Sequence, residues 1–388
     1  MLNKQEYIDK IVSLYIFVSI KTKHMRANYL WSLLLLGLFT NCQNSENKNP
    51  LTMIVGTYTD SPSQGIAIYH FDEKTADATL MSTTPMVNPS YLSLSSDDKY
   101  LYAVSELDSA NATVSSFHFD AKTATLKLIN SKPTYGAYPC NINNDDTRIY
   151  IANYGGGSLC YYEKDQQKGL GELIDVINFN DVPNDTLHPA HAHCVYFSPD
   201  STQVFVNNLG KDLIHCFDRT EDGKLIPSKQ STVEISAGYG PRHSLFAPNQ
   251  TNMYLINELS GMIDVFGYKD KTLTHLQTIA CDSVGGHGSA DIHISNDGRF
   301  VYASNRLKAD GISIFSVQEG GLLTKIAYQT TGIHPRNFIL TPDNNFLLVA
   351  CRDDNQIEIY QRDSQTGLLT DTQKRIELHQ PVCIKWAR

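Results

Sequence analysis

The sequence predicts an all-β protein, a seven-bladed β-propeller whose ring is closed by pairing of the N- and C-terminal strands. Three observations predict this fold. A unit of two strands recurs along the chain, the apolar residues alternate over short runs with no helical periodicity, and a further copy of the unit is split between the two ends of the chain.

The recurring unit consists of a strand, a tight polar turn, and a second strand with a large apolar residue at its centre. Six copies align without an internal gap, and their central residues lie about 46 to 55 residues apart, a spacing that suits one four-stranded propeller blade. These central residues are Tyr102, Tyr150, Phe205, Tyr254, Tyr302 and Leu348. Two further strand-like runs separate consecutive copies, for example residues 113–119 and 125–131. Each predicted blade therefore has four strands.

The seventh copy is divided between the chain ends. Residues 381–388 are similar to the first strand of the unit, and residues 53–60 are similar to its second strand. Pairing of these two segments would close the ring and remove exposed sheet edges. We therefore assign residues 51–388 to one propeller domain.

The N-terminal residues have the pattern of a targeting segment. Arg26 precedes an apolar stretch over residues 29–39, which is too short to span a bilayer, and Cys42 and a polar run follow. This pattern resembles a bacterial lipoprotein signal at residues 25–41, with Cys42 lipidated and residues 42–50 as a polar tether; the alternative is a cleaved secretory signal near an ordinary cysteine. Residues 1–24 fit neither pattern, which indicates a start assigned too early. We expect an envelope lipoprotein facing the periplasm or the cell surface.

Composition excludes some partners and functions. The formal net charge is -9 and the body of the chain has no Lys/Arg run, so no basic stripe is available to bind nucleic acid. The remaining seven cysteines form no C-x-x-C pair, which argues against a zinc or redox motif. We expect a monomer that contacts the membrane only through its N-terminal lipid.

The repeat register brings ionisable residues to one rim of the ring. Because the two strands of each unit form an antiparallel hairpin, the residue before the first strand and the residue after the second lie at the same rim. In consecutive copies these positions hold His193, Arg242, Glu258, Arg306, Arg336 and Arg352. Each alone is an ordinary solvated residue of the rim, but converging guanidiniums need an anion or carboxylate between them. The cluster predicts a binding site for an anionic ligand.

Four strings of residues, in order along the chain, carry a family resemblance. They are Gly240–Asn249, Asn257–Leu259, Ala290–Ile294 and His334–Phe338. Together they resemble the seven-bladed lactonase family, which includes propeller-type 6-phosphogluconolactonases and a carboxymuconate-cyclising enzyme. The resemblance covers about residues 52–388. It implies the propeller fold and, as a function, hydrolysis of a sugar-acid lactone.

Hydrolysis of a lactone requires a positioned water, a base, and cations or donors where the carbonyl oxygen gains charge. The resemblance implies His193, Arg242, Glu258 and Arg306 as the catalytic set. Either Glu258 or His193 could be the base, and Arg242 and Arg306 would stabilise the oxyanion or hold an acidic group of the substrate. Substrate-binding candidates at the same rim are Arg336, Arg352, Glu106 and Tyr154. As solvated rim residues, the catalytic set should matter for chemistry and little for stability.

Two other functions stay open at this point. A lyase that closes or opens a muconate-like lactone would use the same arginines to hold carboxylates, and a non-catalytic envelope propeller would bind a protein or glycan. His188, His191 and His193 resemble a metal cluster, but no carboxylate or cysteine set completes a tetrahedral site, so we expect no metal and no cofactor. No Gly-x-Ser-x-Gly elbow is present, which argues against a serine nucleophile.

Overall fold

The computed structural model describes residues 14, 51–59, 65–180 and 189–387. The expectations for the N-terminal segment lie outside the described residues, apart from Leu14. They concern the early start at residues 1–24, the signal at residues 25–41, the lipidation of Cys42 and the tether at residues 42–50. Within the described part of the chain, no helix is long and apolar enough to cross a membrane.

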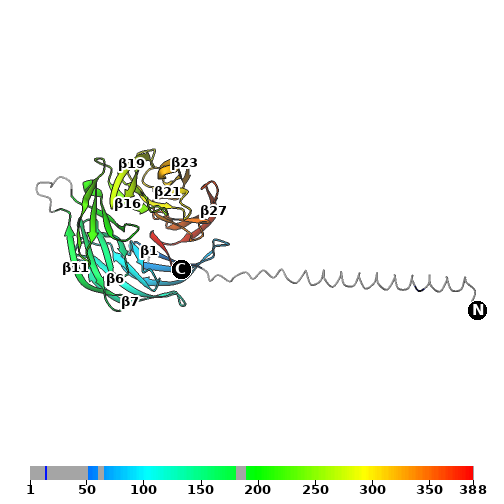
Figure 1. The fold of residues 1–388 in the computed structure, drawn as a ribbon. Helices are drawn as coiled ribbons and strands as arrows, with labels where there is room; N and C mark the ends of the chain where they lie inside the picture. The colour runs from blue at the N-terminus through cyan, green and yellow to red at the C-terminus, as the bar shows by residue number, and fades with distance from the viewer. Residues whose placement is uncertain (1–13, 15–50, 60–64, 181–188, 388) are drawn as a thin grey trace, which may run out of the picture. The chain divides into compact units, whose positions relative to one another are not determined.

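Residues 51–387 form seven four-stranded antiparallel sheets, which confirms the seven-bladed propeller (Figure 1). Each innermost strand contacts the innermost strands of the two neighbouring blades, and these contacts run around the whole ring. The innermost strands are β28 (Pro381–Ala387), β4 (Leu92–Leu94), β8 (Pro139–Asn144), β12 (Ala192–Phe197), β16 (Pro241–Phe246), β20 (Ser289–Ile294) and β24 (Pro335–Leu340).

The second strands of the blades are β1 (Leu51–Thr57), β5 (Tyr100–Ser105), β9 (Arg148–Asn153), β13 (Gln203–Asn208), β17 (Asn252–Asn257), β21 (Phe300–Asn305) and β25 (Phe346–Cys351). The third strands are β2 (Gly65–Phe71), β6 (Thr113–Asp120), β10 (Ser158–Lys164), β14 (Leu213–Arg219), β18 (Met262–Lys269), β22 (Gly311–Val317) and β26 (Gln356–Arg362). The outer strands are β3 (Ala78–Pro85), β7 (Thr125–Pro133), β11 (Leu170–Asn178), β15 (Leu225–Glu234), β19 (Thr272–Ala280), β23 (Leu323–Thr330) and β27 (Leu369–Glu377). Two short 3-10 helices interrupt the described loops, η1 (Leu209–Lys211) and η2 (Glu319–Gly321).

The blade that joins the two ends of the chain has the strand order β28-β1-β2-β3. β1 pairs antiparallel with β28, so the predicted closure by N- and C-terminal strands is confirmed. Trp386 of β28 packs against Phe71 of β2, with ring centroids 5.4 Å apart. The closing strand therefore joins the ring through backbone pairing and through apolar contact.

The core is divided into seven apolar clusters, each shared by two consecutive blades. One cluster combines Ile54 and Ile68 with Leu101 and Phe117, and the others repeat this arrangement around the ring. The central residues of the six repeats are all buried, with at most 1% of their surface exposed. Alternation along the strands explains this burial, because the faces of one blade pack against its two neighbours.

A β-bulge occurs near the start of most innermost strands. The register between β16 and β17 passes from Pro241↔Asn257 to His243↔Ile256, which leaves Arg242 unpaired in the bulge. His193 and Arg336 occupy the same position in β12 and β24. A bulge re-aims the side chain of its extra residue. The repeated bulge thus sets the direction of the rim side chains.

The structure corrects the gapless alignment of one repeat. Asn143 pairs with Tyr150, whereas Tyr196 pairs with Phe205, so the turn after β8 is two residues shorter than the turn after β12. The residue equivalent to His193 is consequently Cys140, whereas an alignment without gaps selects Tyr138. Tyr138 is 48% exposed, whereas Cys140 is buried.

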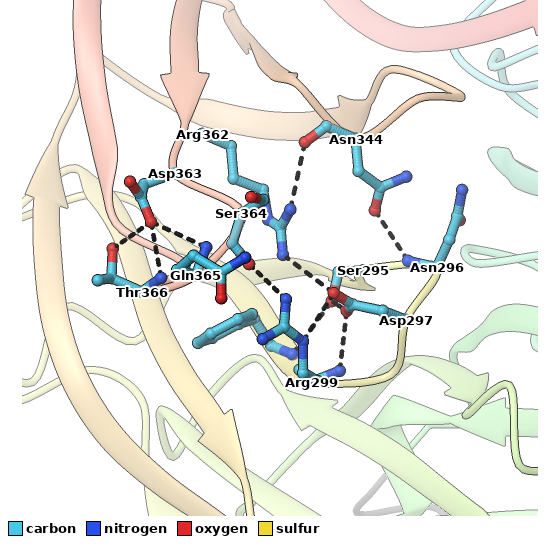
Figure 2. Close-up of polar contacts among 12 residues, drawn as sticks. Ser295, Asn296, Asp297, Arg299, Asn344, Arg362, Asp363, Ser364, Gln365 and Thr366 are labelled. Carbon is cyan, nitrogen blue, oxygen red and sulfur yellow. Dashed lines mark hydrogen bonds and ion pairs between the residues drawn. The ribbon is translucent and has the colours of Figure 1, made fainter.

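The opposite rim is formed by the turns between the first and second strands, and polar side chains join neighbouring blades there. Figure 2 shows Arg362 reaching from β26 toward the turns of two hairpins. Its Nη1 donates to the carbonyl of Asn344 at 3.3 Å, and its Nη2 lies 3.9 Å from Asp297. Arg362 is 5% exposed and its Nε donates to the hydroxyl of Tyr302. Its contacts with Tyr302 and Asp297 connect two blades, at the rim away from His193 and Arg242.

Candidate active site

Three consecutive blades bring the four expected catalytic residues together. Glu258, at the end of β17, accepts a hydrogen bond from Nε of Arg242 at 2.7 Å through its Oε2. Its Oε1 lies 3.0 Å from Nη2 of Arg306, which follows β21. The Nε2 of His193 lies 4.0 Å from Glu258 Oε2, beyond direct hydrogen-bond distance. One carboxylate is thus held by two guanidiniums and faced by an imidazole.

Backbone carbonyls hold the two arginines in place. Arg242 donates from Nη1 to the carbonyl of Ala290 at 2.5 Å. Arg306 donates from Nε to the carbonyl of Gly288 at 2.8 Å, and its Nη1 lies 3.2 Å from Nε2 of His334. Since these partners belong to the backbone or to a neighbouring side chain, both guanidiniums are oriented by the fold itself.

The expectation that these residues are solvated is wrong. Arg242 is 2% exposed, and Arg306 and His193 are 4% exposed. The side chain of Glu258 is 22% exposed, which makes it the most accessible member of the cluster. The bulges and the adjoining blades bury the arginines, so we expect their substitution to reduce stability.

The charges of the cluster follow from burial and from mutual proximity. Burial raises the pKa of Glu258, but Arg242, Arg306 and Arg336 outweigh burial and hold the pKa below its ordinary value. Burial, followed by the charge of Arg242, lowers the pKa of His193 well below the ordinary value for histidine. Burial and Arg242 lower the pKa of Arg306 to about 9, which leaves it charged at neutral pH. The site at pH 7 therefore holds an ionised glutamate, charged arginines and a neutral histidine.

A second group at the same rim comes from the blades of β1, β5 and β24. Arg336 Nη2 lies 3.7 Å from Oε2 of Glu106, and the hydroxyl of Tyr58 donates to the same oxygen at 3.0 Å. The guanidinium of Arg336 also lies over the ring of Tyr58, 5.6 Å from its centroid. The Arg336 side chain donates no hydrogen bond to a described residue, since its contact with Glu106 is a longer ion pair. Tyr58 was not selected from the sequence as a site residue.

Tyr154 and Arg352 differ in their relation to the cluster. The ring of Tyr154 stacks on His191 and meets the edge of His193, with centroids 4.3 and 5.6 Å apart, so it forms part of the wall beside the cluster. Arg352 instead donates from Nε to Asp353 at 2.6 Å. Asp353 lies 3.4 Å from His334, so Arg352 connects with Arg306 only through two other side chains.

A polar group beside the cluster was not selected from the sequence. His243 Nδ1 lies 2.8 Å from Oδ1 of Asp291, and His293 Nε2 lies 3.1 Å from Oδ2. Asn337 donates to the same Oδ2 at 2.5 Å. The available signal was the presence of polar residues inside otherwise apolar first strands, as in Ala290–Ile294.

The described residues include no cluster of metal ligands. Among them, no three His, Cys, Asp or Glu residues are grouped so that they could hold a metal ion. His188, one of the three histidines considered from the sequence, lies outside the described residues. The seven cysteines from Cys140 to Cys383 are all buried and free.

The fold and this site together define a propeller with a buried arginine–carboxylate centre at one rim. The chain matches, over residues 52–386, the family described as "Lactonase, 7-bladed beta-propeller", and it belongs to that family. The resemblance inferred from the four strings is thereby confirmed.

Similar proteins carry lactonase names. A 6-phosphogluconolactonase of Formosa agariphila is 36% identical over 331 residues, which cover 82% of this chain and 94% of that protein. The crystal structure of a putative 6-phosphogluconolactonase from Bacteroides fragilis is similar with a TM-score of 0.85 and 43% identity, covering 89% of this chain and 99% of that one. The periplasmic gluconolactonase of Pseudomonas aeruginosa is similar with a TM-score of 0.82 and 26% identity, covering 87% and 99%. The expected activity, hydrolysis of a sugar lactone, is supported by these relatives.

Proposed function

We propose that this protein hydrolyses a sugar-acid lactone at the cluster of His193, Arg242, Glu258 and Arg306. The observation that carries the proposal is the ionised Glu258, held between two buried arginines and faced by a neutral imidazole at 4.0 Å. A single water can donate one hydrogen to His193 Nε2 and the other to Glu258 Oε2, because two acceptors at this separation can share one donor molecule. Such a water is positioned for attack on a carbonyl carbon.

The reaction balances with this chain's own residues. The water transfers one proton to an acceptor of the cluster, and its oxygen forms a bond to the lactone carbonyl carbon. The carbonyl oxygen gains negative charge, and Arg242 is placed to stabilise it, since its Nη2 makes no hydrogen bond to a described residue. The bond between the carbonyl carbon and the ring oxygen then breaks, and the ring oxygen takes up a proton. The product is a hydroxy acid that releases a proton as its carboxylate forms.

The group around Arg336 supports a role in binding the substrate. Its guanidinium lies 3.7 Å from the carboxylate of Glu106 and over the ring of Tyr58, so its N–H groups remain available to a ligand. A planar guanidinium of this kind binds a carboxylate, a phosphate or adjacent hydroxyl groups. We assign Arg336, Glu106 and Tyr154 to the substrate's polar groups, and we give Arg352 a smaller part in binding because its guanidinium already binds Asp353.

An envelope location is part of the proposal. The pattern at residues 25–42 favours lipidation of Cys42, and a relative of known structure is named as a periplasmic gluconolactonase. An envelope enzyme would meet unphosphorylated lactones. Mass spectrometry of the membrane fraction should find a mature protein that begins at a lipid-modified Cys42, and Cys42→Ser should release the protein from the membrane. An unmodified N-terminus elsewhere, or a membrane-bound Cys42→Ser protein, would refute lipidation.

The activity is tested with purified protein and three substrates, namely gluconolactone, its 6-phosphate and a carboxymuconolactone. We expect hydrolysis of a sugar lactone above its spontaneous rate, and loss of this activity in Glu258→Gln and His193→Gln. Glu172→Gln is the matched control, because Glu172 is exposed on the outer strand β11. Turnover of the carboxymuconolactone alone would support the lyase, and no turnover of any lactone would support a binding propeller.

A further inference from the structure

His193 and His243 occupy consecutive innermost strands and contact each other inside the ring. His193 lies in the bulge of β12, and His243 follows the bulge of β16. Their ring centroids are 5.2 Å apart with an interplanar angle of 67°. His193 is 4% exposed and His243 is 5% exposed. The pair therefore lies in a buried environment, where an unsatisfied polar atom is costly.

Asp291 determines the protonation of His243. The carboxylate accepts four hydrogen bonds, two at each oxygen. Oδ1 accepts from His243 Nδ1 at 2.8 Å and from the backbone amide of Ile292 at 3.0 Å. Oδ2 accepts from Asn337 and from His293 Nε2. An ionised carboxylate provides about four acceptor sites, and here all are used. Because an ionised carboxylate can only accept hydrogen bonds, His243 must donate to it and therefore carries its proton on Nδ1.

The other nitrogen of His243 is left without a partner. Burial, followed by the charge of Arg242, lowers the pKa of His243 to about 4, so the ring is neutral at pH 7. With the proton on Nδ1, its Nε2 carries a lone pair. Both His243 Nε2 and His193 Nδ1 are buried and have no hydrogen-bond partner. Two unpartnered nitrogens on rings in edge-to-face contact can satisfy each other only if one donates and the other accepts.

We propose that the His243–Asp291 pair positions His193 as the general base, by accepting a hydrogen bond from His193 Nδ1 through one bridging water. His193 Nδ1 is then the donor, and its Nε2, which faces Glu258, bears the lone pair. The proposal rests on the hydrolytic function and names its base. Glu258, already bonded to two arginines, orients the water and does not take its proton.

The proton path then runs from the rim into the ring. The attacking water gives its proton to His193 Nε2, the imidazolium is stabilised through Nδ1–H by His243 and Asp291, and the same proton returns to the ring oxygen of the lactone as the bond to it breaks. The opposite tautomer of His193 would leave lone pairs on both His193 Nδ1 and His243 Nε2, and its protonated Nε2 could not accept a proton from the attacking water. His243 and Asp291 are thus positioning residues and do not touch the substrate.

The tautomer of His193 tests the proposal without any substrate. In protein labelled with ¹⁵N-histidine, long-range ¹H–¹⁵N correlation spectra distinguish a proton on Nδ1 from one on Nε2, and His193→Gln assigns the signal among the 13 histidines. We expect the Nδ1–H form in the wild type and a shift toward the Nε2–H form in His243→Phe, which removes the acceptor. An Nε2–H form in the wild type would overturn the proposal even if the protein is an active lactonase.

Kinetics provide the second measurement. His243→Phe should lower kcat about tenfold or more with little change in KM, since it acts on the base and not on binding, and His243→Asn should recover part of the loss by supplying an acceptor. His293→Gln is the matched control: His293 is the other imidazole partner of Asp291, but the contact with His193 belongs to His243. Wild-type kcat in a folded His243→Phe protein, or an equal loss in His293→Gln, would refute positioning through His243. Absence of lactone hydrolysis in the wild type would refute the proposed function alone.

Discussion

Glu258→Gln separates the two roles of the rim cluster because it keeps the shape of the side chain and removes its charge. In the wild type, the two oxygens of Glu258 face the guanidiniums of Arg242 at 2.7 Å and Arg306 at 3.0 Å. In the variant, an amide nitrogen, which cannot accept a hydrogen bond, would replace one of these oxygens. Arg242 and Arg306 would also lose their shared counter-ion while they are only 2% and 4% exposed. The substitution should therefore reduce both stability and turnover.

The magnitude follows from burial. Breaking a buried ion pair by removing one partner costs about 3 to 5 kcal/mol, and the 22% exposure of the Glu258 side chain points to the lower end, about 3 kcal/mol. For a domain of this size, about 3 kcal/mol corresponds to a decrease in Tm of about 4 °C. If Glu258 orients the attacking water, kcat should fall about a hundredfold or more.

Calorimetry and initial-rate kinetics on a lactone that the wild type hydrolyses measure the two effects. Glu106→Gln is the matched control, since it makes the same chemical change at the same rim, where Arg336 lies 3.7 Å from the carboxylate. It should lower Tm by less than Glu258→Gln and should act mainly on KM. A Glu258→Gln protein with unchanged Tm and wild-type kcat would refute the reasoning from the buried arginine–carboxylate centre.

Three further predictions concern binding, pH and ring closure. Arg336→Ala should raise KM about tenfold with a smaller change in kcat, and Arg336→Lys should restore part of the binding. Arg352→Ala should raise KM less than Arg336→Ala does. Equal effects of the two alanine variants on KM would contradict the assigned roles. Burial and Arg242 lower the pKa of His243 from 6.5 to about 4. As the pH falls, His243 is therefore protonated at a higher pH in the unfolded chain than in the folded protein. The free energy of unfolding should then fall as the pH decreases from about 6.5 to about 4, and His243 should account for about 2 kcal/mol of the loss between pH 7 and pH 5. Denaturant unfolding of His243→Gln should show a weaker pH dependence than the wild type. An unchanged pH dependence would contradict the role assigned to His243. Deletion of residues 381–388 should abolish cooperative unfolding and cause aggregation, because it removes the partner of β1 and exposes a strand edge; a truncated chain with wild-type melting would show that closure contributes little.

The position of the rim residues along each repeat was predictable. The period of the central residues from Tyr102 to Leu348 defines where each hairpin begins and ends, so Arg242, Glu258 and Arg306 could be placed at one rim from the sequence. The closure by residues 381–387 was predictable for the same reason, because a half-unit at each chain end has only the other half to pair with.

Alignment without gaps failed where the hairpin turn changed length. Tyr138 lies two residues before Cys140, which takes the bulge position, and only the pairing of Asn143 with Tyr150 reveals the shift. A change of turn length moves the first strand relative to the second without changing the period of the second strands, which carried the alignment.

The blade count, the closure of the ring and the rim to which the charged residues belong follow from the repeat, whose period can be measured in the sequence alone. Which of these residues contact one another became apparent from the three-dimensional arrangement of the blades. Glu258 joins Arg242 and Arg306, Arg352 turns to Asp353, and His243 meets Asp291 across 48 residues of sequence. The physical reason is that each of these contacts depends on a bulge, a rotamer or the packing of consecutive blades, and the period of the repeat specifies none of the three.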